Sequence, residues 1–165
     1  SPHLHTEDFS KERLDISLMS NYIVSMQTEH LIALVSAIRD KANRFIFEQL
    51  KARGIQDIAP AHGGVFFHLF RTPELTMGEL ARLIDRDKST VTSLVEKLVR
   101  LGYIKREKDS VDHRVTKIKL TEKGTFLEAD FAEISRSLLT KSYGGLSDKE
   151  MAVIVELLAR VNNNF

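Results

Sequence analysis

Apolar residues recur every three or four positions along most of this chain, and this spacing predicts a largely helical fold. Residues typical of helix ends divide the pattern into segments. Thr76 and Ser147 each stand three residues before a glutamate, as in a capping box, and Gly54 and Gly102 follow apolar stripes. The helices predicted in this way cover, in order, residues 28–54, 60–71, 76–84, 87–101, 121–143 and 147–165.

The period of the pattern changes between the fourth and the fifth predicted helix. Residues 103–108 and 115–120 are short, rich in residues that favour strands and partly alternating, and the polar stretch 109–114 joins them. This pattern predicts a two-stranded β-hairpin. The predicted fold class is therefore mainly α with a small β-hairpin.

Two short helices joined by a tight turn at Asp85 and Arg86, with a hairpin directly after them, are typical of a winged helix-turn-helix. Asp85 suits the turn because aspartate tolerates the left-handed region of backbone conformation. A helix fits the major groove of DNA, which is about 12 Å wide, and a hairpin wing can reach the neighbouring backbone or the minor groove. The sequence therefore predicts a winged helix-turn-helix over residues 58–120.

The fourth predicted helix has a polar face opposite its apolar stripe of Val91, Val95 and Leu98. Small hydroxyl side chains near its amino end would let the backbone approach base edges, where they donate or accept hydrogen bonds, and its lysines would reach phosphates. The alternative for these residues is ordinary helix capping with a solvated face, but the adjacent hairpin favours DNA binding. The predicted DNA contacts on this helix are Lys88, Ser89, Thr90, Thr92, Ser93 and Lys97.

The predicted wing carries four further candidate DNA contacts. Arg106 and Lys108 lie along its first strand, and His113 and Arg114 lie at its tip. An arginine on a thin loop suits a narrow minor groove, where the negative potential of DNA is strongest. We expect Asp112 to hold Arg114 through a charge-assisted hydrogen bond. The alternative is that Asp112 is only a turn residue in a flexible loop.

The distribution of charge agrees with a polyanionic partner. Residues 86–119 hold ten lysines and arginines against five aspartates and glutamates, whereas the remainder of the chain is acidic and the whole chain has a formal net charge of +1. A basic middle between acidic ends is expected for a nucleic-acid-binding protein. A basic stretch is also typical of a solvated face, so the charge only supports the pattern described above.

Several motifs resemble those of MarR-type (multiple antibiotic resistance) regulators. The Asp112-His-Arg114 tip, the apolar strand after it and the Leu120-Thr-x-x-Gly124 segment resemble the wing signature of that family. Similar resemblances occur at Leu80-Ala81 with residues 87–98, at Pro60–His62 and at Leu146–Glu150, so the likeness runs from about residue 28 to the end. Residues 1–27 match nothing in the family core and are interpreted as an N-terminal extension.

The resemblance implies a homodimer whose dimerisation helices are residues 28–54 and 121–165, with two winged lobes that bind a palindromic operator in double-stranded DNA. It implies a transcription regulator of the repressor kind. Independently of the resemblance, apolar residues of the last helix, among them Leu158, Val161 and Phe165, exceed what a small winged lobe could cover. A partner subunit is the natural place to bury them.

Members of this family often respond to small aromatic or phenolic acids, so the resemblance implies an aromatic effector. The residues that could line such a pocket are Phe45, Phe66, Phe67, His68 and Phe70. An aromatic cluster at helical spacing is also typical of a hydrophobic core, and this alternative stays open.

Two other functions are weighed. His3, His5, Glu7 and Asp8 could hold a metal ion, which would make the protein a metal-responsive regulator; the alternative is a tail without a site. The remaining histidines lie on separate elements, so no metal and no cofactor is predicted. The second alternative is a winged helix that serves as a protein–protein or dimerisation module without binding DNA.

The sequence gives no support to an enzyme or a membrane protein. It has no phosphate-binding glycine loop, no GxSxG, no HExxH and no cysteine, and the absence of cysteine also excludes disulfides and thiolate zinc sites. No apolar run is long enough to span a bilayer, and the start lacks the features of a signal peptide. We therefore expect a cytoplasmic protein that is not an enzyme.

Overall fold

The computed structural model describes residues 30–165, so the predicted N-terminal extension and the candidate metal ligands His3, His5, Glu7 and Asp8 lie outside the described residues. The chain divides into two compact units, residues 1–43 and 44–165. The boundary falls within α2 (Leu31–Ala52), the helix predicted from residue 28 to Gly54. The second unit contains the predicted winged helix-turn-helix and is described below.

The first helices of this unit follow the predicted pattern with one change. The predicted helix over residues 60–71 is a 3-10 turn, η1 (Pro60–His62), followed by α3 (Gly63–Arg71). α4 (Met77–Ile84) begins with the predicted capping box. The Thr76 hydroxyl accepts a hydrogen bond from the Glu79 backbone N–H at 3.2 Å, and the Glu79 carboxylate accepts from the Thr76 N–H at 2.7 Å.

The turn between α4 and α5 (Lys88–Arg100) depends on the backbone of Asp85. Asp85 has φ 56° and ψ 53°, which is the left-handed conformation that the sequence led us to expect there. Within residues 30–165 it is the one residue other than glycine with a positive φ. The turn sets the angle between the two helices of the motif and therefore the direction in which α5 emerges.

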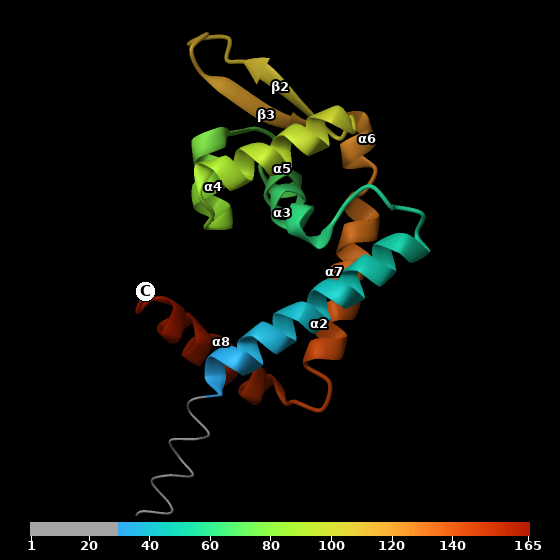
Figure 1. Ribbon diagram of the computed structural model, residues 1–165, viewed down its shortest axis with the longest axis vertical. Helices are drawn as coiled ribbons and strands as arrows, with labels where there is room; N and C mark the ends of the chain where they lie inside the picture. The colour runs from blue at the N-terminus through green and yellow to red at the C-terminus, as the bar shows by residue number, and fades with distance from the viewer. Residues whose placement is uncertain (1–29) are drawn as a thin grey trace, which may run out of the picture. The chain divides into compact units, whose positions relative to one another are not determined.

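The predicted hairpin is confirmed. β2 (Ile104–Lys108) and β3 (Thr116–Leu120) pair antiparallel, with Arg106 opposite Ile118, and they extend beyond the helices as a wing (Figure 1). A third strand, β1 (Leu75–Thr76), pairs with β3 and was not predicted. The sheet order is β1-β3-β2. The short β1 connects the base of the wing to the start of α4.

The core lies beneath α5, where the predicted stripe of Val91, Val95 and Leu98 is fully buried. Phe66 of α3 is also fully buried, and its ring contacts those of Tyr103 and Phe131 at centroid distances of 5.9 and 4.9 Å. Burial of a side chain of this size contributes about 1.5–3 kcal/mol. The aromatic contacts join α3, the start of the wing and α7 (Glu128–Ser142) around one apolar centre.

The prediction of one continuous helix over residues 121–143 is wrong. The chain forms α6 (Glu122–Thr125) and then α7, and between them the Leu127 N–H donates to the Gly124 carbonyl, only three residues back. α6 packs tightly against the base of the wing. A Cβ on Gly124 would lie 2.2 Å from the Tyr103 carbonyl oxygen. The helix therefore changes to a tighter turn, with a hydrogen bond between residues three apart, before it continues as α7.

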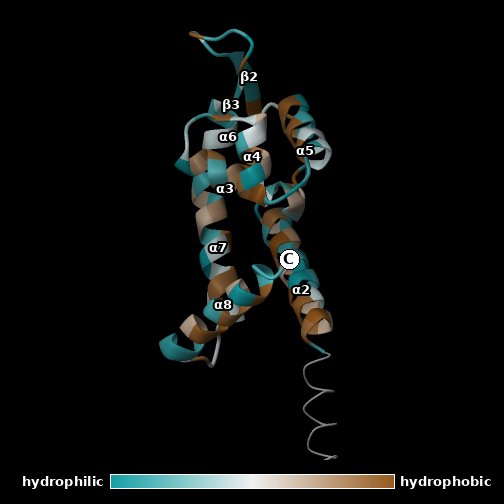
Figure 2. Cartoon of the chain, turned by 90° about the vertical axis from the view of Figure 1, so that its left-hand side faces the viewer, coloured by the Kyte–Doolittle hydropathy of each residue, from teal (hydrophilic) through white to brown (hydrophobic). Residues whose placement is uncertain are grey.

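The last helix, α8 (Asp148–Asn162), begins with the predicted capping box at Ser147 and Glu150. None of its residues is buried. Figure 2 shows hydrophobic residues along it, and five of its large apolar side chains are 39–54% exposed. They are Val153, Ile154, Val155, Leu157 and Leu158.

The helices of residues 30–165 do not include one that could cross a membrane. α2 is 22 residues long, but charged residues such as Arg39, Asp40 and Lys41 interrupt it.

Candidate nucleic-acid interface

The amino end of α5 is organised by Asp87, a residue that the sequence analysis placed at the helix start without giving it a role. Its carboxylate accepts hydrogen bonds from the Thr90 backbone N–H at 2.9 Å and from the hydroxyls of Ser89 and Thr90 at 2.6 Å each. These bonds hold the pKa of Asp87 well below its usual range. The signal in the sequence was an aspartate with hydroxyl residues two and three positions later, which is typical of an N-cap.

The next two hydroxyls also donate within the helix. Thr92 donates to the Lys88 carbonyl at 2.7 Å and Ser93 to the Ser89 carbonyl at 3.2 Å. Carboxylates and carbonyls can only accept, so each of the four hydroxyls on this end of α5 directs its single hydrogen inward. The outward groups are then lone pairs, which can accept from the amino groups of adenine or cytosine in a major groove. The sequence led us to expect that these hydroxyls donate or accept hydrogen bonds; in the structure they are available outward as acceptors.

The lysines of α5 lie on two sides of this hydroxyl face. Lys88 is exposed in the first turn, and Lys97 is half-buried further along the helix. Neither forms an ion pair with another residue in the described range 30–165. Both charges are therefore available to an external anion.

The first strand of the wing directs two cations toward the side of α5. Alternation along β2 puts Arg106 and Lys108 on the same side as the buried Ile104. The Arg106 guanidinium lies 3.9 Å from the Glu96 carboxylate of α5, a pairing that the sequence analysis missed. The Lys108 ammonium donates to the Thr116 hydroxyl at 3.2 Å. Helix and wing therefore present their polar groups as one surface.

The predicted contact at the wing tip is present. The Asp112 carboxylate accepts from Arg114 Nε at 3.0 Å, from Arg114 Nη2 at 3.1 Å and from the Arg114 backbone N–H at 3.0 Å. This pairing raises the pKa of Arg114 and lowers that of Asp112. The Arg114 side chain is still 91% exposed, so it is oriented yet open to a partner. His113, beside it, is also exposed.

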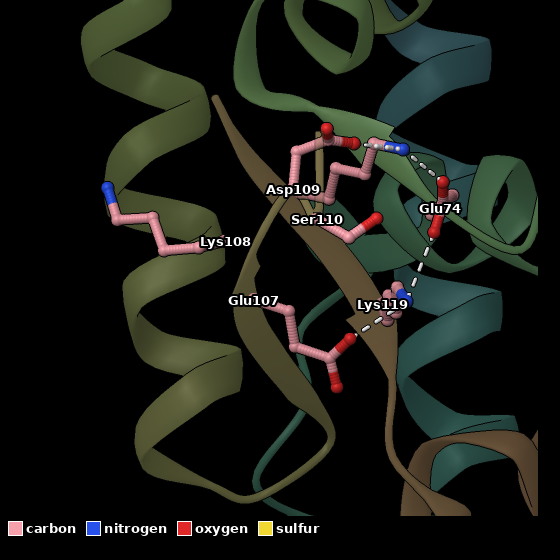
Figure 3. A pocket seen from close by; sticks show the side chains of 7 residues that line it. Glu74, Glu107, Lys108, Asp109, Ser110 and Lys119 are labelled. Carbon is pink, nitrogen blue, oxygen red and sulfur yellow. Dashed lines mark hydrogen bonds and ion pairs between the residues drawn. The ribbon is translucent and has the colours of Figure 1, made fainter. Parts of the chain in front are cut away.

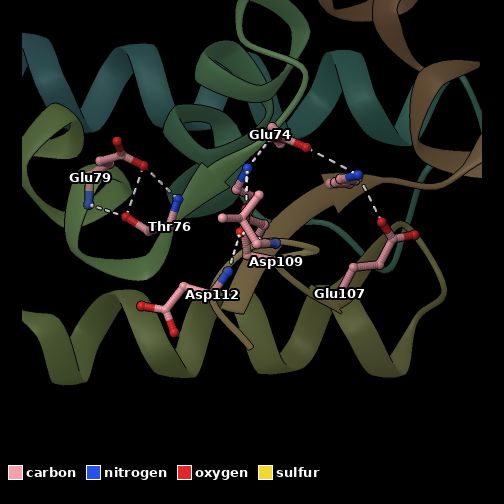
Figure 4. Close-up of polar contacts among 9 residues, drawn as sticks. Glu74, Thr76, Glu79, Glu107, Asp109 and Asp112 are labelled. Carbon is pink, nitrogen blue, oxygen red and sulfur yellow. Dashed lines mark hydrogen bonds and ion pairs between the residues drawn. The ribbon is translucent and has the colours of Figure 1, made fainter. Parts of the chain in front are cut away.

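The opposite face of the sheet carries lysines that are already paired. Lys117 contacts Glu74 and, at 2.7 Å, Asp109; Lys119 contacts Glu74 at 3.1 Å (Figure 4). These ion pairs lower the pKa of Glu74 and raise that of Lys117. Glu74 lies just before β1 and had no role in the sequence analysis, because no local pattern connects it to residues more than forty positions away.

A second carboxylate extends this arrangement along the sheet. Glu107 contacts Lys105 at 2.5 Å and Lys119 at 2.8 Å, and these lysines lower its pKa to about 2. A cavity of about 190 Å³ lies beside this carboxylate. Its lining includes Glu107 and Lys119, and also Lys108, whose side chain points toward α5 (Figure 3). We name the ion-paired residues the outer-face network: Glu74, Lys105, Glu107, Asp109, Lys117 and Lys119.

The outer-face network changes how the basic middle of the chain is interpreted. Three of the ten lysines and arginines counted there are neutralised on the face of the sheet away from α5. The positive charge that remains lies on α5 and the turn before it, on the side of the wing nearest α5 and at the tip. Charge is therefore concentrated on one surface more sharply than the sequence indicated.

The five aromatic candidates for an effector pocket do not surround one space. Phe66 is fully buried in the core beside Phe70, with their centroids 5.8 Å apart. Phe67 is 47% exposed and stacks under the Arg71 guanidinium at 3.6 Å, with the neighbouring His68 ring set edge-on to it. Phe45 lies 5.7 Å from the Lys141 ammonium. Phe66 is thus a residue of the hydrophobic core, as the alternative interpretation held, whereas Phe67 is exposed and does not point into the core.

Histidine has a structural role in this unit. His62 is 3% exposed, and its Nδ1 accepts a hydrogen bond from the Ala59 N–H at 3.0 Å. Burial lowers the pKa of His62, and the nearby Lys97 charge acts in the same direction. Over residues 30–165, no three histidine, aspartate or glutamate side chains come together as a metal site would require.

Comparison with known proteins finds a family model that matches part of the chain. Residues 56–115 match the family model described as MarR family. The regulator SarZ of Staphylococcus aureus is 31% identical over 93 residues, which are 56% of this chain and 62% of SarZ. The uncharacterised regulator YdgJ of Bacillus subtilis is 23% identical over 96 residues, 58% of each chain. The chain thus spans about three fifths of the length of these relatives.

Solved structures have the same fold. A MarR transcriptional regulator from Methanosarcina mazei has a TM-score of 0.70 at 24% identity, covering 82% of this chain and 96% of its own. A mutant MarR from E. coli, complexed with operator DNA, has a TM-score of 0.71 at 24% identity, covering 79% and 92%. BpsR of Bordetella bronchiseptica, whose DNA binding is regulated by 6-hydroxynicotinic acid, has a TM-score of 0.72 at 18% identity, covering 82% and 94%.

These findings define the class of the protein as a winged helix-turn-helix of the kind found in transcriptional regulators. Residues 56–115 are similar to the MarR family, which agrees with the resemblance of the wing and recognition segments. The proteins compared above are named as regulators and not as enzymes, in agreement with the prediction that this chain is not an enzyme.

Proposed function

We propose that this chain is a sequence-specific, double-stranded DNA-binding transcription regulator that acts as a homodimeric repressor on a palindromic operator. The observation that carries the proposal is the pair of exposed polar groups at the hydroxyl end of α5 and at the Arg114 tip of the wing, on two elements that the Arg106–Glu96 contact joins. Lys117 and Lys119, which would otherwise spread positive charge beyond these groups, are neutralised by ion pairs on the other face of the sheet. Cytoplasmic location is part of the proposal, since the partner is chromosomal DNA.

Each group has a distinct role in this proposal. The hydroxyls of α5 enter the major groove as acceptors, facing the amino groups of adenine or cytosine. Phosphate oxygens only accept hydrogen bonds, so they cannot bond to hydroxyls whose hydrogens already point into the helix. The phosphate contacts are therefore made by Lys88, Lys97 and Lys108. Arg114 enters the neighbouring minor groove, and Asp112 fixes its direction.

The exposed face of α8 supports the dimer. Five of its large apolar side chains are exposed in the single chain, and a second copy of the same helix would cover them. Two recognition helices must then lie about 34–36 Å apart, one turn of DNA. Leu158→Lys should convert the dimer into a monomer in sedimentation analysis, with Lys149→Gln on the same helix as a control that stays dimeric. A dimeric L158K protein would contradict this part of the proposal.

We propose further that a small aromatic acid releases the protein from DNA. The support is the relative BpsR, whose DNA binding is regulated by 6-hydroxynicotinic acid. Because Phe66 and Phe67 face different surroundings, the aromatic cluster as a whole is not assigned as the site. A set of hydroxylated aromatic acids that neither raises the melting temperature nor releases bound DNA would contradict this proposal.

Selection of bound fragments from a random pool of duplex DNA tests the DNA-binding function. The expected product is a palindrome whose half-sites are centred about 10 base pairs apart. Failure to enrich any sequence, with binding equally weak for every fragment, would favour the alternative of a protein–protein module.

A further inference from the structure

A chain of contacts runs from the body of the winged lobe to the tip of the wing. Glu74 lies between α3 and β1, and its carboxylate contacts both Lys117 and Lys119 on β3 (Figure 4). Lys117 in turn contacts the Asp109 carboxylate at the far end of the wing, at 2.7 Å. The side chain of Lys117 therefore bridges the base of the wing and the beginning of its tip.

Asp109 in turn fixes the backbone of the loop at the wing tip. Its carboxylate accepts from the backbone N–H groups of Val111 and Asp112, each at 2.9 Å, and its own N–H donates to the Val115 carbonyl at 2.9 Å. The Lys117 ammonium, together with the backbone N–H groups of Asp112 and Val111, holds the pKa of Asp109 well below its usual range. The position of Asp112 is thus set by Asp109, and Asp112 orients Arg114.

From this geometry we infer that Glu74 is a positioning residue for DNA recognition, which acts through Lys117 and Asp109 on the direction of Arg114. The inference rests on the proposed function and deepens it. The wing needs such a support because a two-stranded hairpin is only marginally stable by itself and the anchoring strand β1 has two residues.

The ion pairs of Glu74 lie at the surface, and pairs of that kind contribute little to overall stability. Removing the Glu74 charge should therefore leave the fold intact and loosen the wing. A purely electrostatic role predicts the opposite effect on binding, since loss of a negative charge near DNA strengthens attraction for every sequence. Positioning and electrostatics thus predict changes of opposite sign in the affinity for the selected palindrome.

The first experiment compares Glu74→Gln with Glu48→Gln, which removes an identical charge from an exposed position on α2. Binding to the selected palindrome and to random duplex is measured by fluorescence anisotropy. E74Q should weaken palindrome binding by about three- to thirtyfold, as coupled sites do, and leave random-duplex binding unchanged or stronger. E48Q should change neither. Stronger palindrome binding by E74Q would overturn the inference.

The second experiment asks whether Glu74 acts through Arg114. In an Arg114→Ala background, the further change Glu74→Gln should have no effect on palindrome binding, because no oriented guanidinium is left to misplace. Losses that multiply in the double variant would show that Glu74 acts independently of Arg114 and would overturn the inference.

Two controls keep the outcomes distinct. Urea unfolding of E74Q should match the wild type, and a large loss of stability would assign Glu74 to folding and overturn the inference. If the wild-type protein binds no DNA, the proposed function itself fails. If the wild type and R114A behave as proposed while E74Q resembles E48Q, only the role of Glu74 fails.

Discussion

Glu96 of the recognition helix and Arg106 of the wing lie 3.9 Å apart, so the two elements that would contact DNA meet through opposite charges. Both side chains are well exposed, at 51% and 38%. A pair of this kind adds little to stability. Its consequence is that Glu96 competes with a phosphate for the guanidinium of Arg106.

Glu96→Gln should therefore strengthen binding to all duplex sequences. The substitution removes a negative charge from the surface and releases Arg106, which gains about one phosphate contact per subunit and steepens the salt dependence accordingly. The measurement is affinity against salt concentration for the palindrome and for random duplex. Weaker binding to both would mean that the pair holds the wing in place and does not compete with DNA.

The hydroxyls and the lysine of α5 should behave differently. Thr92→Ala or Ser93→Ala should weaken binding to the selected palindrome by about 1–3 kcal/mol and relax the sequence preference. Lys97→Ala should weaken binding to all sequences about equally. Repeating the random-pool selection with each variant separates the two effects, and equal losses on specific and random DNA for both classes would contradict the assigned face.

Gly124 should be required for folding. Gly124→Ala puts a methyl group 2.2 Å from the Tyr103 carbonyl oxygen, so α6 must shift away from the base of the wing. The free energy of unfolding should fall by about 1–3 kcal/mol or more, as in other overpacked sites. Gly78→Ala in α4 is the matched control, because a Cβ there meets nothing within 4 Å. Equal urea midpoints for the two variants would contradict this account.

His62 should make stability depend on pH. Burial lowers its pKa below the ordinary 6.5, so the folded protein keeps the imidazole neutral while the unfolded chain takes up a proton as the pH falls through 6.5. Stability should therefore decline as the pH falls from about 7 to about 5. His62→Gln should show a flatter profile over that window. Parallel profiles for the two proteins would contradict the assignment to His62.

The local features of this fold could be predicted from sequence because each is set by residues close together in the chain. The capping boxes at Thr76 and Ser147, the left-handed Asp85 and the hairpin all follow from such short patterns. The hydrogen bond between Asp112 and Arg114 joins residues two positions apart and was predicted as well.

The features that were missed depend on tertiary contacts. β1 has two residues and no period of its own, and it exists because β3 pairs with it. The interruption before α7 comes from the close approach of Gly124 to Tyr103, which the continuous apolar pattern does not reveal. Glu74 finds its lysines more than forty residues away. In the candidate interface, the sequence predicted which residues could contact DNA. Only the tertiary structure shows which cations of the region, such as Lys117 and Lys119, are neutralised by ion pairs.

The direct test of the central claim is the salt dependence of binding to the selected palindrome, for the wild type and for Arg114→Ala. Three phosphate-binding lysines in each of two subunits predict a slope of about −5 in log affinity against log salt. Arg114→Ala should weaken palindrome binding at least about tenfold and leave the dimer intact. Binding that does not change with salt, or no binding by the wild type even in dilute buffer, would contradict the account.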